Sequence, residues 1–121
     1  MAVAKTAKVV KSERLGPDTL LLDLWTAEPL GFIGGQYLIL DSRIVLPNGK
    51  AVKRAYSLLT CDAEQRRFQL AVKRIPGGFG SSFVHGLAAG MDISFSGPWG
   101  KFVLPEGTSG RTVILATDTG I

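Results

Sequence analysis

The residues whose types and spacing could do chemistry together lie in one stretch, K-R-A-Y-S-L-L-T at positions 53–60. Its apolar middle, with Tyr and Thr, predicts a strand. Strand alternation places Arg54 and Tyr56 on one face and Ser57 on the other. A guanidinium offers a rigid fork of N–H donors that suits a phosphate, and a phenol ring offers a flat surface that suits a planar ligand. Taken alone, the stretch favours a core strand with a snorkelling arginine and a half-buried tyrosine.

A glycine-rich loop followed by a predicted helix is the second stretch suited to binding. The loop covers 75–80, and residues 81–89 fit a short helix with Ser81 or Ser82 at its N-cap. A helix start binds anions through unpaired N–H groups, and glycines let the backbone approach a phosphate. A loop that only reverses the chain explains the glycines equally well. If the helix start and the strand arginine hold one phosphate, the tyrosine can cover a flat ring, and this combination describes a flavin nucleotide.

The elements that must position these residues are mostly strands. Turn residues at 16–18, 47–49 and 97–100 separate short apolar or alternating segments. We therefore expect an all-β fold, a six-stranded antiparallel Greek-key barrel with one short helix late in the chain. The expected strands cover 5–15, 19–26, 36–41, 53–60, 67–74 and 92–96, and a further apolar strand is expected over 112–117.

Composition limits the possible functions. The 121 residues suffice for one domain with one core, and the net charge of +4 is compatible with a phosphate-bearing ligand without indicating nucleic acid. The single cysteine excludes an internal disulfide, a thiolate zinc site and a four-cysteine iron–sulfur centre, and the single histidine argues against a histidine-rich metal site. No apolar stretch approaches the roughly 20 residues of a membrane span, so we expect a reduced, cytoplasmic protein.

Five short motifs follow one another along the chain. They are G-Q-Y at 35–37, R-A-Y-S at 54–57, V-K-R with G-G-F-G-S within 72–81, G-P-W-G-K-F at 97–102 and V-I-L-A-T-D-T-G-I at 113–121. Together they resemble the ferredoxin–NADP reductase superfamily, whose flavin-binding domain is a riboflavin synthase-like barrel. Two positions depart from the family pattern: Gly34 stands where a proline is usual, and Asp118 replaces a glycine of the last loop.

The resemblance implies a role for each matching residue. Arg54 would pair with the flavin phosphate, and Tyr56 would pack on the ring system or bond to the ribityl chain. Ser57 would form a hydrogen bond near the hydride-accepting ring nitrogen, so Tyr56 and Ser57 are the expected catalytic residues. The strand residues at 72 and 74 would act mainly through their backbone. The expected cofactor-binding residues are Arg54, Ala55, Tyr56, Ser57, Val72, Arg74, Gly78, Gly80, Ser81 and Ser82.

The resemblance also implies an activity. A nicotinamide hydride from NAD(P)H would pass to FAD, or to FMN, and single electrons would leave for an iron–sulfur protein or a haem, with a ferredoxin-like protein or an oxygenase as acceptor. The expected division is a flavin-binding barrel over 1–111 and, over 112–121, the first strand and loop of an NAD(P)-binding domain. Because the sequence stops before the rest of such a domain, we expect weak or no NAD(P)H turnover from this chain alone.

Two alternatives remain open. One is a barrel without a cofactor that serves as a regulatory or docking module and has no catalysis. The other is an OB-like barrel that binds single-stranded nucleic acid, for which only the segment at Arg66, Arg67, Phe68 and Lys73 combines basic and aromatic residues. A flavin absorbance band in the purified protein would separate the flavin hypothesis from both.

Other conspicuous residues are expected to be mainly structural. Gln36 and Tyr37 fit either the wall of the flavin site or, for the tyrosine, the core. The remaining ones are Trp99 and Phe102 as core anchors of a turn, His85 on the helix surface, and Cys61 as a small packing residue.

Overall fold

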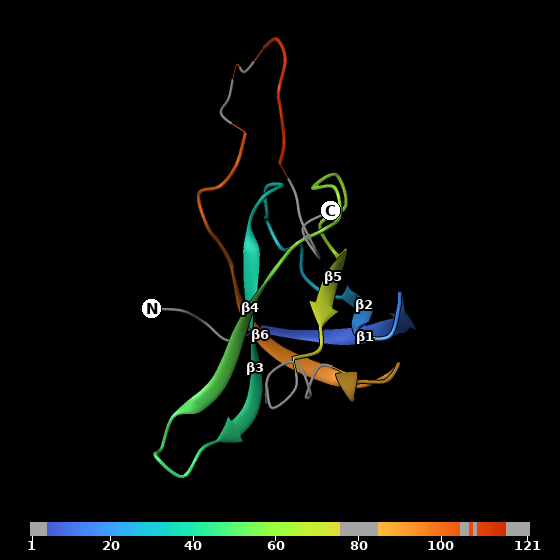
Figure 1. The fold of residues 1–121 in the computed structure, drawn as a ribbon, viewed down its shortest axis with the longest axis vertical. Helices are drawn as coiled ribbons and strands as arrows, with labels where there is room; N and C mark the ends of the chain where they lie inside the picture. Colours follow the sequence, from blue (N-terminus) through green and yellow to red (C-terminus); the bar gives the residue numbers. More distant parts are fainter. Residues whose placement is uncertain (1–4, 76–84, 105–106, 108, 116–121) are drawn as a thin grey trace.

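Six strands form one antiparallel sheet in the computed structural model, which describes residues 5–75, 85–104, 107 and 109–115 (Figure 1). The order across the sheet is β4-β3-β6-β1-β2-β5. The hairpins β1–β2 and β3–β4 pair along the sequence, and β6 lies between β1 and β3, which is a Greek-key arrangement. The all-β prediction is confirmed. The strands are β1 Lys5–Arg14, β2 Thr19–Trp25, β3 Tyr37–Val45, β4 Ala51–Ser57, β5 Arg67–Lys73 and β6 Asp92–Trp99.

The core lies on one face of the sheet because buried apolar residues alternate along the strands, as at Leu20, Leu22 and Leu24 of β2. Phe68 on β5 meets Phe95 on β6 edge to face, with ring centroids 6.1 Å apart. These two strands are not neighbours in the sheet, so the sheet must curve around a shared core. The register sets the buried residues of β2 directly opposite those of β5: Leu20 with Val72, Leu22 with Leu70 and Leu24 with Phe68.

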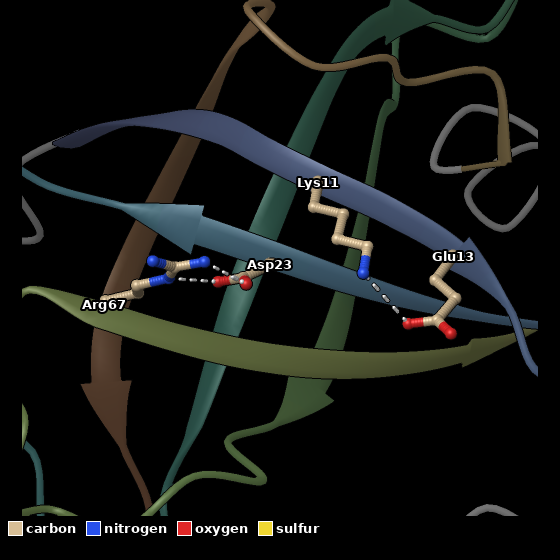
Figure 2. A network of polar contacts seen from close by, with 4 residues as sticks. All are labelled: Lys11, Glu13, Asp23 and Arg67. Atoms are coloured by element: carbon tan, nitrogen blue, oxygen red, sulfur yellow. Dashed lines mark hydrogen bonds and ion pairs between the residues drawn. The ribbon is translucent and has the colours of Figure 1, made fainter.

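The opposite face of β1, β2 and β5 carries polar side chains (Figure 2). Arg67 donates two hydrogen bonds to Asp23, from Nε to Oδ1 at 3.0 Å and from Nη2 to Oδ2 at 2.8 Å. Lys11 lies 3.6 Å from Glu13. The Asp23 carboxylate is nearly buried, so the two charge-assisted bonds replace the water that it loses on folding. The exposed Lys11–Glu13 pair contributes little stability.

The predicted barrel does not close. Strands β4 and β5 are the two edges of the sheet, and no ladder joins them in the part of the chain that the structure describes. One backbone hydrogen bond, from Leu59 N to Gln69 O at 3.0 Å, links the chain just after β4 to β5. Figure 1 shows β4 (green) and β5 (olive) separating from that end. We call these two facing edges the β4–β5 seam.

Strand β3 is longer than predicted. It runs to Val45 instead of ending at Asp41, through an irregular stretch of its pairing with β4. Within this stretch Arg43 has a φ of 61°, which is unusual for a residue with a side chain. The Arg43 guanidinium donates to Ser94 Oγ on β6, with Nη2 at 2.6 Å, and its backbone N–H donates to Asp41 Oδ1 at 2.8 Å. These bonds stabilise the irregular backbone that the sequence did not reveal.

Two further boundaries differ from the predicted ones. Strand β4 begins at Ala51 and ends at Ser57, where the prediction placed it over 53–60. Strand β6 continues to Trp99, through residues predicted to be a turn. The extension of β6 follows from its partner, because Trp99 pairs across the sheet with Tyr37 at the start of β3.

The late part of the chain contains little regular structure. The helix predicted over 81–89 lies mostly outside the described residues; of the described ones, His85 is helical, and 86–90 are turn or irregular. The strand predicted over 112–117 does not form in its described part, 112–115, where Val113, Ile114 and Leu115 are 76%, 80% and 95% exposed. Among the described residues, no helix has the length and apolarity needed to cross a membrane.

Candidate functional site

The predicted site strand, β4, has the alternation that its sequence indicates. Val52 and the following Leu58 are buried, and Tyr56, between them on the same face, is half-buried and packs against the core. Arg54 belongs to this inner face by register, opposite Leu40 of β3, and yet it is exposed. The inner face therefore becomes accessible along β4, because no strand covers it on the β5 side.

Tyr56 and Arg54 interact electrostatically. Burial of the Tyr56 phenol raises its pKa, because the charged phenolate loses water, and the positive charge of Arg54 partly opposes this shift. The Arg54 guanidinium donates from Nη1 to the carbonyl of Lys53 at 2.8 Å. A guanidinium carries five N–H donors, so further donors can meet an anion beside the phenol.

The raised pKa of Tyr56 predicts a titration result. Tyr56 should deprotonate above the usual value of about 10. The folded state holds this proton more tightly than the unfolded state does, so the free energy of unfolding should fall as the pH rises above about 10. An ultraviolet absorbance titration checks this, and Tyr56→Phe should remove a titration step that lies above the usual value. If the step that Tyr56→Phe removes lies at the usual value, the prediction is wrong.

Strand β5 faces the seam with its backbone, in a register that the sequence did not reveal. The Gln69 carbonyl points toward β4, because it accepts from Leu59 N, and a strand directs every second residue's backbone groups to the same side. Ala71 and Lys73 therefore direct their backbone groups toward β4. Arg74 N instead donates to Asp18 O at 2.6 Å, on the β2 side. The side-chain pattern could not show which β5 residues turn their backbone to β4 and which to β2, since both sets alternate along one strand.

Four basic side chains flank the seam. Lys53 and Arg54 on β4 are exposed, and so are Lys73 and Arg74 at the end of β5. Ala55, also exposed, follows Arg54 on β4. Cations gathered on both edges make the seam a favourable place for a phosphate or diphosphate.

Ser57 and Tyr56 lie on opposite faces of β4, as alternation predicts. Ser57 is exposed, pairs across the sheet with Tyr37, and is the last residue of the strand. A ligand that runs along the inner face can reach its hydroxyl only by passing the strand end. One elongated ligand could therefore meet both residues, Tyr56 with its flat face and Ser57 with its edge.

The motifs G-Q-Y and G-P-W-G-K-F contact each other directly. The Gln36 side chain donates from Nε2 to Gly100 O at 3.1 Å and accepts from Ile33 N at 2.9 Å, so its polar atoms are engaged within the protein. A Cβ on Gly100 would press on the Tyr37 ring at 3.0 Å. Of the two roles predicted for Gln36 and Tyr37, these contacts favour the structural one. Both motifs serve to hold the start of β3 against the end of β6.

Four predictions about single residues are wrong. Phe102 is 90% exposed and Trp99 is 38% exposed, so neither is a core anchor; the chain leaves the sheet after Trp99. Cys61 is exposed on the loop after β4, so it does not pack internally. His85 is half-buried, with Nε2 3.0 Å from the carbonyl of Val72 on β5, so it does not lie freely on a helix surface.

The remaining predicted site residues are placed as follows. Val72 is fully buried in the core, and its side chain contributes to packing. The predicted phosphate-binding residues lie outside the described part of the chain; they are Gly78, Gly80, Ser81 and Ser82.

The described residues fit a flavin nucleotide. A cationic edge suits its phosphate, the half-buried Tyr56 ring suits its flat ring system, and the seam-facing backbone of β5 can pair with the polar edge of that ring. The residues come from the two edge strands, which only the curvature of the sheet brings together.

Comparison with known proteins agrees with this fit. The family model of the oxidoreductase FAD-binding domain matches residues 6–104. The reductase subunit of an aromatic O-demethylase from Amycolatopsis sp. is 36% identical over 121 residues, covering 96% of this chain and 35% of that protein. A ferredoxin–NADP reductase B from Sorangium cellulosum is 35% identical over 117 residues, covering 95% and 47%.

Solved structures show the same fold. The crystal structure of a cytochrome P450 reductase from Amycolatopsis superposes with a TM-score of 0.71 at 38% identity, covering 87% of this chain and 31% of that one. The chain thus spans between about a third and a half of the length of these three relatives. The resemblance seen in the motifs is confirmed: the chain belongs to the oxidoreductase FAD-binding domain family, of the ferredoxin reductase type.

Proposed function

We propose that this chain binds FAD along the β4–β5 seam and acts as the flavin module of an NAD(P)H-dependent reductase. The observation that carries the proposal is the position of the motif residues. Arg54, Tyr56 and Ser57 lie on one edge strand of the sheet, β4, and the seam-facing backbone of Ala71 lies on the other, β5. Among the described residues, no ladder joins the two edge strands β4 and β5, which carry these residues.

Each residue then has a role set by its place. The Arg54 fork and the neighbouring cations hold the phosphate, together with the glycine and serine residues predicted at 78–82. Tyr56 would pack against the flat ring system, and its phenol can donate a hydrogen bond because a tyrosine is neutral at physiological pH. Ser57, at the strand end, would donate a hydrogen bond to the polar edge of the ring system. When bound, the flavin supplies the redox chemistry, and the protein supplies orientation and electrostatics.

The partners of the whole protein follow by analogy. The name of one relative contains ferredoxin and the name of another contains an aromatic O-demethylase, so we propose an iron–sulfur or haem protein as the electron acceptor. We further propose that residues 112–121 open an NAD(P)-binding domain. Phe102, Val113, Ile114 and Leu115 support this, because four large apolar side chains are unusually exposed for residues that serve no partner.

The decisive experiment is a titration of the purified chain with FAD and with FMN. We expect a protein-bound flavin absorbance band with FAD, and quenching of flavin fluorescence by the Tyr56 ring. Tyr56→Leu should bind with less quenching. A spectrum identical to that of free flavin with both nucleotides, and no flavin retained on gel filtration, would favour the module without a cofactor. Binding of FMN alone would correct the cofactor but keep the site.

A further inference from the structure

A polar loop after the site strand holds the loop that leads into β3. The two side chains responsible are Asp62 and Gln65, which we call the loop clasp. The segment that they hold, 30–36, crosses from β2 to β3 and buries Leu30 and Phe32 in the core. None of the five sequence motifs includes the clasp.

Gln65 pairs with the Phe32 backbone as a neighbouring strand would. Its Oε1 accepts from Phe32 N at 2.8 Å, and its Nε2 donates to Phe32 O at 2.8 Å. The same Nε2 donates to the backbone carbonyl of Asp62 at 2.7 Å. The backbone carbonyl of Gln65 accepts from Leu30 N at 2.8 Å. One carboxamide therefore satisfies both backbone groups of a buried residue that no strand pairs with.

The held segment connects directly to the proposed site. Asp62 Oδ2 accepts from Gly34 N at 3.0 Å, which fixes the turn before Gln36. The Gln36 carbonyl then accepts from Leu58 N at 3.0 Å. Leu58 follows Ser57, so this bond sets the direction in which the end of β4 leaves the sheet.

We propose that the loop clasp positions Ser57, and that Asp62 and Gln65 are positioning residues for the flavin site. The inference rests on the proposed function, because Ser57 matters only if a ring edge reaches it. The path has three steps, of which the first and the last are hydrogen bonds: the clasp holds the 30–36 segment, the segment presents the Gln36 carbonyl, and that carbonyl holds Leu58. A clasp that merely stabilised the fold would lower stability without changing the surroundings of Ser57.

Two variants and a matched control test this. Gln65→Glu keeps the acceptor for Phe32 N but sets a carboxylate oxygen against the carbonyls of Phe32 and Asp62. Asp62→Ala removes only the bond to Gly34 and lies on an exposed loop, so it should fold. Asn48→Asp makes the same chemical change on the turn between β3 and β4, outside the clasp, and keeps the side-chain acceptor for Lys50 N.

The first measurement needs no flavin. Amide hydrogen exchange at Leu58 should quicken by about tenfold in Gln65→Glu, and by less in Asp62→Ala, because the Gln36 carbonyl is no longer held. In Asn48→Asp, Leu58 should exchange at the wild-type rate. Unchanged Leu58 exchange in Asp62→Ala and in any folded Gln65→Glu would overturn the proposal, even if both proteins melt earlier.

The second measurement uses the flavin-loaded protein. Gln65→Glu should shift the reduction potential of the bound flavin in the same direction as Ser57→Ala, and the double variant should show no additional shift. Additive shifts would overturn the link to Ser57. If the wild-type chain retains no flavin, the proposed function fails and positioning of a flavin site fails with it. Leu58 exchange would then show separately whether the clasp holds the strand end.

Discussion

Replacing Arg54 with alanine is expected to weaken FAD binding by about 10- to 150-fold, which corresponds to the loss of roughly 1.5–3 kcal/mol for a hydrogen bond to a charged group. Arg54 is exposed on the inner face of β4, and its guanidinium takes no part in pairing the strands. The fold should therefore survive the change. Fluorescence titration of wild-type and variant protein with FAD measures the effect. Thermal unfolding without flavin should be nearly unchanged.

Two further variants give this experiment its controls. Lys53→Ala removes an exposed cation from the adjacent residue, on the opposite face of β4, and should reduce affinity only slightly through long-range electrostatics. Arg54→Lys keeps the charge but loses the fork, so its affinity should lie between those of wild type and Arg54→Ala. If Lys53→Ala and Arg54→Ala weaken binding equally, the phosphate is held by general positive charge and not by Arg54.

Replacing Gly35 with alanine is expected to destabilise the protein by about 3–5 kcal/mol, among the larger effects of a single substitution. Gly35 has a φ of 103°, and a Cβ there would collide with the backbone carbonyl of Phe102. Backbone cannot move aside as a flexible side chain can, so the start of β3 and the segment after β6 must separate. Chemical denaturation of the folded chain measures the loss.

Two nearby glycines separate the effect of the positive φ from the effect of the contact with Phe102. Gly31 also has a positive φ, 76°, but nothing lies within 4 Å of its Cβ position, so Gly31→Ala should cost only the strain of about 1–2 kcal/mol. Gly34 has an ordinary φ and only Asp62 Oδ2 at 3.9 Å, so Gly34→Ala should be nearly neutral. If Gly35→Ala is no worse than Gly31→Ala, the contact with Phe102 is not structural.

Strand β4 shows how much of the site a local sequence pattern can predict. The alternation of Arg54, Tyr56 and Ser57 follows from backbone geometry alone, because successive residues of any strand point to opposite faces. The structure keeps that arrangement. The all-β fold was predictable for the same reason, since turns and two-residue periodicity are properties of neighbouring residues.

Other parts of the site could not be predicted from residues that are close together in the sequence. Whether Val72 or Ala71 turns its backbone to the seam depends on one hydrogen bond between Gln69 and Leu59. The clasp residue Gln65 looks like part of an ordinary polar turn, and its partner Phe32 lies 33 positions earlier. Such contacts join residues that the chain brings together only after it has folded.

By itself, the sequence determined the strand composition, the faces of β4 on which Arg54, Tyr56 and Ser57 lie and the family, since these depend on local periodicity and on short motifs that follow one another in order. Only the tertiary structure decided that the sheet stays open between β4 and β5, that Phe102 is exposed and that His85 contacts the Val72 carbonyl. The physical reason is that closure, exposure and long-range hydrogen bonds depend on how distant strands curve around one core. No segment of the chain encodes that curvature alone.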